Sequence, residues 1–234
     1  MNKNVIIYHG SQQILTNPEF PFRKKPYYDF GQGFYCTADR ELAMEWACPA
    51  NRDGYVNRYE LNTEDLKVID LTRPPYSLLS WFALILRSRK FDITGDLNSK
   101  ARVYTLSNFV PAIGDADVLI GYRADDGYFA AAEQFFNDRI TLRQLAELFR
   151  RNESCQQIVL LTEKAHSQLT FTGYETADSR KYYYLRTQRD ASMMEALEEK
   201  KVSPALTDDS PTIFDIIREV MRHDDPRIQS SLSE

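Results

Sequence analysis

Three residues of this 234-residue chain have side chains suited to holding a small ligand, and each lies on or beside a predicted strand. His9 ends the strand predicted over residues 4–8, Tyr35 lies in the strand GFYCT, and Gln157 opens the strand QIVLLT. A neutral imidazole donates one hydrogen bond and accepts another, which suits a diol. A tyrosine offers a flat wall that can orient a planar ring. Each residue taken singly is more often structural, so the hypothesis of a site rests on the three together.

Glycines and small polar residues surround the first two of these positions. The string Y-H-G-S occupies residues 8–11, and the string D-F-G-x-G-F-Y-x-T occupies residues 29–37. Gly10 and Gly33 can let the backbone approach a ligand closely, because glycine has no Cβ. An amphipathic helix containing A-x-x-W-A is predicted directly after the second string.

This succession of motifs resembles the ADP-ribosyltransferase superfamily and, within it, a bacterial family of uncharacterised domains that carries both strings. The resemblance continues more weakly through residues 121–126 and 157–165 and is not followed past about residue 175. It implies an α+β fold in which a split, mixed and antiparallel β-sheet is flanked by helices. It also implies that NAD binds as a substrate in the cleft of that sheet, without a metal.

The resemblance assigns a role to each motif residue. His9 takes the position that holds the adenosine-side ribose, with Ser11 beside it. Gly10 takes the position whose main chain pairs with the nicotinamide amide, and Tyr35 the position that stacks on the nicotinamide ring. Asp29 either anchors its loop or contacts adenine. The remaining cofactor-binding candidates are Phe30, Gly31 and Gly33.

The chain departs from the family at the third catalytic position, where the transferases have a glutamate at the start of the fifth strand. Gln157 matches that position, with Gln156 as an alternative one residue away, and an amide carries no negative charge. If losing the charge resembles losing one oxyanion-hole donor, the rate falls by about 10²–10³. Asp125 or Asp126, after the strand DVLIGY, is therefore expected to supply the charge together with Gln157. The alternative is that the two aspartates cap the following helix.

Three functions are compatible with these residues. The first is transfer of ADP-ribose from NAD to a macromolecule, in the manner of a bacterial toxin controlled by a small antitoxin partner. The second is NAD hydrolysis in the same cleft, and the third is a catalytically silent module that binds NAD or ADP-ribose. An enzyme is favoured, but the uncharged side chain of Gln157 is also compatible with the silent module. An RNA 2′-phosphotransferase needs more basic motifs than the chain has.

Composition excludes several other classes of protein. Lys and Arg total 29 and Asp and Glu total 34, so the formal net charge is −5, which excludes a globally basic nucleic-acid binder and mildly favours a protein acceptor. Three distant cysteines and three scattered histidines predict neither a disulfide framework nor a metal site. The most apolar stretch, residues 78–86, is too short to span a membrane. The N-terminus has no long apolar leader, so we expect a cytoplasmic protein without a membrane partner.

The hydrophobic patterns predict short strands mixed with helices. Residues 1–186 are expected to form the ADP-ribosyltransferase-like domain, with a basic loop at residues 22–28. Residues 187–234 are expected to be a polar segment and an amphipathic helix that begins near residue 210. This helix is expected to pack on the domain, and the alternative is that it docks a partner. The other strands are expected at residues 55–61, 66–71, 117–122, 169–174 and 181–186, and the other helices at residues 75–89, 141–151 and 163–169.

Overall fold

Two β-sheets form the centre of the computed structural model, which describes residues 3–20, 29–88, 96–123, 126–150, 156–202 and 209–230. A three-stranded antiparallel sheet has the order β1-β3-β7, and a four-stranded sheet has the order β2-β6-β5-β4. In the second sheet β4 and β5 are parallel and the other pairs are antiparallel. The strands are β1 (Asn4–Ser11), β2 (Phe34–Cys36), β3 (Gly54–Asn62), β4 (Val68–Asp70), β5 (Val118–Tyr122), β6 (Gln156–Leu160) and β7 (Leu169–Ala177).

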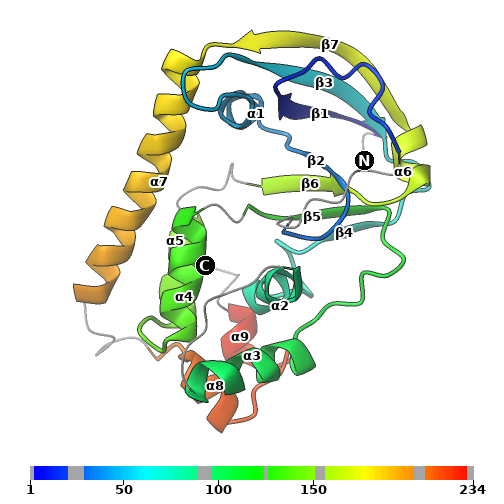
Figure 1. Ribbon diagram of the computed structural model, residues 1–234. Coiled ribbons are helices and arrows are strands. Elements are labelled where there is room, and N and C mark those ends of the chain that lie inside the picture. The colour runs from blue at the N-terminus through cyan, green and yellow to red at the C-terminus, as the bar shows by residue number, and fades with distance from the viewer. Residues whose placement is uncertain are drawn as a thin grey trace.

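The sheets stack face to face, and most of the helices lie on the far side of the four-stranded sheet (Figure 1). The fold is therefore α+β with mixed and antiparallel sheets and flanking helices, as the sequence predicted. The helices are α1 (Arg40–Ala47), α2 (Leu78–Ser88), α3 (Asp96–Asn108), α4 (Asp126–Phe136), α5 (Leu142–Arg150), α6 (Glu163–Ser167), α7 (Ser179–Val202), α8 (Ile213–Arg218) and α9 (Pro226–Ser230).

Successive side chains on the strands of the four-stranded sheet point to opposite faces, and each face packs in its own hydrophobic cluster. Phe34 and Leu160 point towards the three-stranded sheet, where they pack with Ile7 and Tyr59. Val159 faces the other way and joins the larger cluster that is formed mainly by the helices. The four-stranded sheet is thus covered on both faces, which explains its continuous apolar strands.

The two sheets meet at their edges. β1 and β2 are edge strands of their respective sheets, and they are joined by a bridge between Tyr8 and Thr37. Each residue donates its main-chain N–H to the carbonyl of the other, at 2.8 and 2.9 Å. We call this junction the β1–β2 seam; His9 and Tyr35 lie next to it in the sequence.

The apolar stretch at residues 78–86 is the most deeply buried helix of the described structure. All nine of these residues are buried within α2, and a helix that is apolar on every side is expected in the core of a domain. Its side chains pack against α4, α5 and the four-stranded sheet through Trp81 and Phe82. In the part of the chain that the structure describes, no helix combines the length and apolarity needed to cross a membrane.

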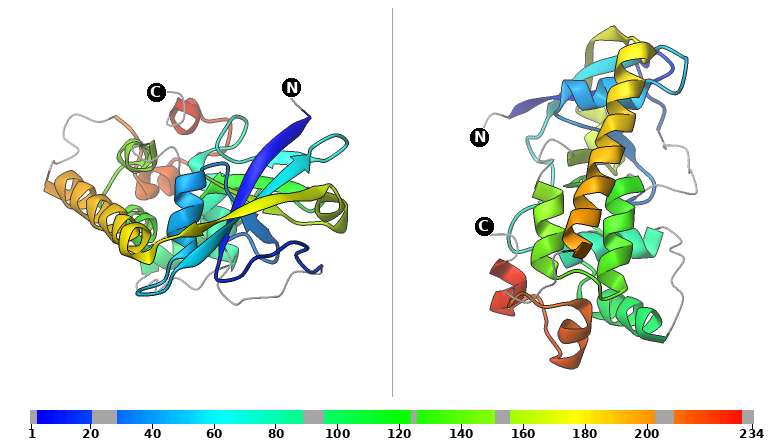
Figure 2. Two further views of the ribbon diagram at one scale, coloured as in Figure 1. Left: turned by 90° about the horizontal axis from the view of Figure 1, so that it is seen from above. Right: turned by 90° about the vertical axis from the view of Figure 1, so that its left-hand side faces the viewer.

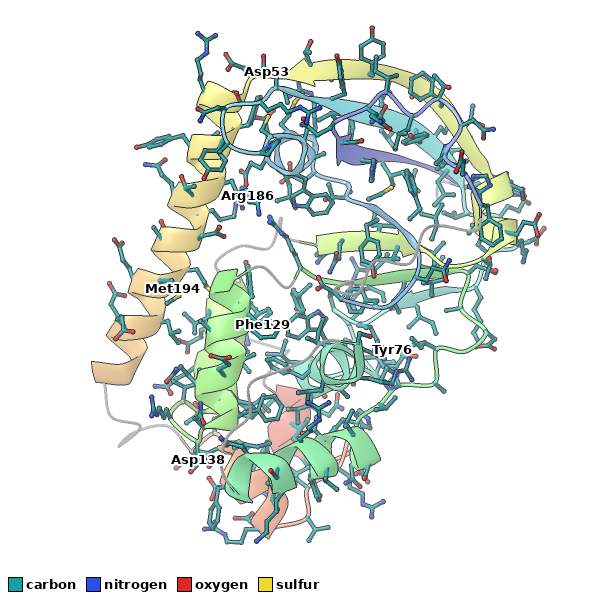
Figure 3. The ribbon with its side chains drawn as sticks, viewed as in Figure 1. Asp53, Tyr76, Phe129, Asp138, Arg186 and Met194 are labelled. Carbon is teal, nitrogen blue, oxygen red and sulfur yellow. The ribbon has the colours of Figure 1, made fainter. Side chains whose placement is uncertain are left out.

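The prediction of a strand at residues 181–186 is wrong, because these residues lie in α7. The helix begins where the carboxylate of Asp53 accepts hydrogen bonds from both the N–H and the hydroxyl of Ser179, at 2.8 and 2.9 Å; Asp53 is labelled there in Figure 3. Tyr182 is buried whereas Tyr183 and Tyr184 are exposed, a pattern that alternation in a strand does not produce. α7 runs alongside α4 and α5 (Figure 2) and crosses residues 186 and 187, the expected domain boundary, without a break.

The C-terminal helix is shorter than predicted. α8 begins with a capping box between Thr212 and Asp215 and ends at Arg218. Val220, which was expected on its apolar stripe, has a left-handed φ of 54° and is 58% exposed. Ile213 and Met221 do pack into the cluster around α2. The N-terminus of α8 is tied to the end of α4 by Asp138 (Figure 3), which accepts a hydrogen bond from the main chain of Phe214.

Candidate functional site

Gln157 lies at the start of β6 and is hydrogen-bonded to the carboxylate of Asp29. Its Nε2 atom donates to Asp29 Oδ2 at 2.8 Å and to the carbonyl oxygen of Tyr122 at 3.1 Å. Gln157 is 4% exposed and Asp29 is 6% exposed. Both partners are acceptors, and this fixes which end of the amide carries the nitrogen.

This pair accounts for an amide at position 157. A glutamate at position 157 would turn an acceptor oxygen towards the Asp29 carboxylate and the Tyr122 carbonyl, and neither can donate. Asp29, which accepts the hydrogen bond from the Gln157 amide, comes from the loop before β2. A buried carboxylate requires hydrogen bonds in compensation for lost hydration, and Gln157 supplies one of them.

The loop that carries Asp29 is attached to Tyr35. The Tyr35 hydroxyl donates to the carbonyl of Gly31 at 2.7 Å and accepts from the N–H of Phe30 at 3.0 Å. Gly31 has a left-handed φ of 87°, which glycine adopts readily. The Phe30 ring packs directly on β5, where a Cβ on Gly121 would lie 2.6 Å from it. The structure therefore brings Asp29, Tyr35 and Gln157 into one hydrogen-bonded group.

His9 approaches this group from the other side of β2. Its ring stacks on Phe34, with centroids 4.5 Å apart, and its Nδ1 atom lies 2.7 Å from the carbonyl oxygen of Tyr35. Phe34 and Tyr35 point to opposite faces of β2, so the His9 imidazole lies across the strand from the Tyr35 ring. Because a carbonyl can only accept, Nδ1 carries a proton; in the neutral ring Nε2 is then an acceptor.

The motif glycines make close contacts within the protein. A Cβ on Gly10 would lie 2.1 Å from the carbonyl oxygen of Ala43, so the absence of a side chain at Gly10 allows α1 to pack closely on β1. A Cβ on Gly33 would lie 2.5 Å from the side chain of Val159, so the absence of a side chain at Gly33 allows close contact with β6. The Ser11 hydroxyl accepts a hydrogen bond from the N–H of Gln13 at 3.1 Å. These contacts give both glycines a packing role.

Several expected groups lie outside the described residues. Asp125 and the basic loop at residues 22–28 are among them, and for Asp126 only the main chain, as the first residue of α4, is described. The sequence predicts that one of these aspartates supplies a negative charge beside Gln157, because both follow a strand. It does not predict that role for Asp29. The signal for Asp29 was its place at the head of the motif that also contains Tyr35.

Arg123 was not among the candidates predicted from the sequence. It follows β5, is buried, and places its guanidinium 5.5 Å from the ring centroid of Trp46 on α1, within the range of a cation–π interaction. Trp46 is half-buried and packs against the larger hydrophobic cluster. Among the described side chains, no group of three or more His, Cys, Asp or Glu could hold a metal ion.

No curated protein and no solved structure matches the chain. One family model does, over residues 5–171, a span that includes both motif strings, Gln157 and all of the strands except the first residue of β1 and the end of β7. The chain therefore belongs to the family described as "Protein of unknown function (DUF3990)".

Proposed function

We propose that this chain cleaves the bond between nicotinamide and ribose in NAD and transfers the ADP-ribosyl group to a macromolecule. Two observations support the proposal. The first is the succession of motifs that resembles the ADP-ribosyltransferases. The second, which carries most weight, is the Asp29 carboxylate hydrogen-bonded to Gln157, since it offers the negative charge that Gln157 lacks.

In the proposed reaction the C1′–N bond breaks and its electron pair stays with nicotinamide. Positive charge develops on the ribose ring, and a nucleophilic N–H or O–H group of the acceptor then forms a bond to C1′ and releases its proton to solvent. A carboxylate held in place before the reaction stabilises such a charge without reorganisation. Asp29 is assigned this role, and Gln157 acts as a positioning residue that holds the carboxylate through Nε2.

NAD is proposed to bind along the β1–β2 seam. At the seam β2 meets β1 through the Tyr8–Thr37 bridge, and an extended dinucleotide that passes the end of β2 is proposed to contact both of its faces. On one face the Nε2 atom of His9 can accept a hydrogen bond from a ribose hydroxyl. On the other face the Tyr35 ring can support the nicotinamide ring, with its hydroxyl already held by the loop at residues 29–31.

The test compares Asp29→Asn with wild type and with Asp115→Asn, an exposed control of the same chemistry. Release of nicotinamide from NAD and incorporation of adenylate-labelled NAD into bacterial lysate are both measured. Asp29→Asn should lower both rates by about 10²–10³, and Asp115→Asn should leave them unchanged. Equal rates in wild type and Asp29→Asn would remove Asp29 from the reaction. Protease or nuclease sensitivity of the label identifies the class of acceptor, which we propose to be protein.

The resemblance also implies a toxin restrained by a small antitoxin, and this can be tested in cells. Expression of the wild-type chain in a bacterium should arrest growth, and expression of Asp29→Asn to the same level should not. Growth arrest by both proteins would show that the toxicity does not depend on NAD cleavage through Asp29.

A catalytically silent module that binds NAD or ADP-ribose is the second candidate. The observation that favours it is the deep burial of both Asp29 and Gln157, which engage each other in the described structure. Titration calorimetry would then detect NAD binding while no nicotinamide is released. Hydrolysis, the third alternative, would release free ADP-ribose in the absence of any acceptor.

A further inference from the structure

A pocket of about 340 Å³ opens at the end of the four-stranded sheet, beside the candidate site. Its walls come from the segment after β4, the end of β5, the start of β6, and the helices α2 and α5. The lining includes two arginines, two other polar residues and two aromatic residues: Arg73, Arg150, Thr72, Gln156, Tyr122 and Phe149.

The pocket adjoins the Asp29–Gln157 pair but is built from different side chains. Gln156 is paired with Tyr122 across β5 and β6, and the next pair along is Gly121 with Gln157. Gln157 donates to the main-chain carbonyl of Tyr122, whereas the Tyr122 side chain lines the pocket. A ligand in this pocket would therefore occupy a separate position from the proposed NAD site.

The charge of the described lining is positive. Arg73 and Arg150 are cationic, and among the described residues that line the pocket none is acidic. Asp70, which lies outside the lining, is 3.3 Å from the Nε atom of Arg73 and also accepts from the Thr72 hydroxyl. A guanidinium has five N–H donors, so the contact of Nε with Asp70 leaves the two terminal nitrogens of Arg73 to meet a ligand.

We propose that this pocket binds the phosphate monoester group of a small aromatic ligand. Two guanidinium groups offer several N–H donors to the three terminal oxygens of a phosphate monoester, which also carries more negative charge than a carboxylate. The planar guanidinium also matches phosphate oxygens in geometry. Tyr122, whose ring packs on that of buried Phe149 with centroids 5.3 Å apart, provides an aromatic wall for the rest of the ligand. This proposal does not depend on NAD cleavage.

Titration calorimetry of the full chain with four probes tests the chemistry of the ligand. Phenyl phosphate should bind most tightly, inorganic phosphate and benzoate more weakly, and phenol least, because only phenyl phosphate combines a dianionic group with a ring. Benzoate binding as tightly as phenyl phosphate would overturn the assignment to phosphate. Phenol binding as tightly as phenyl phosphate, or no binding of phenyl phosphate, would overturn the site.

Variants of the two arginines test the location. Arg150→Gln and Arg73→Gln should each raise the dissociation constant of phenyl phosphate by about tenfold or more, as expected for loss of a charged hydrogen-bonding partner. Arg143→Gln, at the exposed start of the same helix α5, is the matched control and should bind as wild type does. Arg73 is exposed, so its substitution is not expected to affect folding. Unchanged binding in both variants would overturn the proposal, and Asp29→Asn should keep phenyl phosphate binding whatever its effect on NAD.

Discussion

The Nε2 atom of Gln157 donates a hydrogen bond to Oδ2 of Asp29 across 128 residues of sequence. The same nitrogen donates to the Tyr122 carbonyl, so both of its hydrogens face acceptors. Gln157 is therefore the donor of the pair and Asp29 the acceptor. A carboxylate at position 157 would face the acceptor atoms of Asp29 and Tyr122 with no hydrogen to donate.

Exchanging the two groups tests the pair as a unit. Gln157→Glu should lower the free energy of unfolding by about 3 kcal/mol, because it buries a second carboxylate against the first. Adding Asp29→Asn should recover at least about 1 kcal/mol, since the amide can then donate to the new carboxylate. Recovery should be incomplete because the Tyr122 carbonyl loses its donor. Urea unfolding of the four proteins in the cycle measures this coupling, and strictly additive effects would contradict it.

Gly10→Ala tests the packing role assigned to that glycine. Its new Cβ would lie 2.1 Å from the Ala43 carbonyl oxygen, which belongs to the backbone of α1 and cannot rotate away. Displacement of α1 should lower the free energy of unfolding by about 1–3 kcal/mol. Gly114→Ala is the control, because a Cβ there would meet no atom within 4 Å; thermal unfolding should place it within about 0.5 kcal/mol of wild type. A Gly10→Ala protein as stable as the control would show that α1 can move without cost.

Local patterns were sufficient to predict most of the sheet. β3, β5 and β6 were predicted within a few residues, because alternation and apolar runs depend only on neighbouring positions. The run K-Y-Y-Y-L-R is rich in residues with high β-propensity, yet it is helical, because Asp53 supports the start of α7 and the helix packs against α4 and α5. Contacts of this kind are set by the tertiary structure, which overrides weak local preferences.

The candidate site was predictable in part for the same reason. His9 and Tyr35 stood out because their motifs are short strings read along the chain. The pairing of Asp29 with Gln157 depends on the register between β2 and β6 and on the path of the loop before β2, which no local pattern determines. In the absence of that information, the sequence reasoning selected Asp125 and Asp126 because they follow a strand.

Asp117 should make folding stability depend on pH. Hydrogen bonds from the Thr162 hydroxyl at 2.6 Å and the Lys67 N–H at 2.9 Å, with Lys164 nearby, lower the pKa of Asp117 below its ordinary value of 3.8. Because the folded-state pKa is depressed, this stabilisation is complete well above pH 3.8 and is lost as the pH falls through the folded-state pKa. Asp117→Asn should therefore be less stable than wild type by about 2 kcal/mol at pH 7.

The check on Asp117 is a series of urea unfolding curves from pH 7 down to pH 3. The difference in unfolding free energy between wild type and Asp117→Asn should shrink as the pH falls below about 4, where the carboxyl of the unfolded chain becomes protonated. A difference that stays constant over the whole range would show that the ionised form of Asp117 makes no special contribution.

The ion pair between Arg189 and Glu45 should make α7 part of one cooperative unit with the sheets. Arg189 lies beyond residue 186, and its guanidinium contacts Glu45 of α1 through two nitrogens, at 2.7 and 3.1 Å. The Glu45 side chain is 3% exposed and that of Arg189 is 20% exposed. Arg189→Gln leaves the Glu45 carboxylate buried without its cation and should lower the unfolding free energy by about 3 kcal/mol. Arg180→Gln, on the same helix but 90% exposed, should change it by less than about 1 kcal/mol.

Two probes distinguish one unit from two in the Arg189→Gln experiment. Far-UV circular dichroism reports the helices, α7 included, and tryptophan fluorescence reports Trp46 and Trp81. Met193 and Leu197 of α7 pack in the same cluster as Trp81, so both signals should follow a single transition that moves to lower urea concentration together. If residues 187–234 formed a separate unit, the circular dichroism would shift while the fluorescence transition stayed in place. If the two transitions coincide, loss of the ion pair with Glu45 destabilises the whole core. We expect this result because α7 continues through residue 186 as one helix.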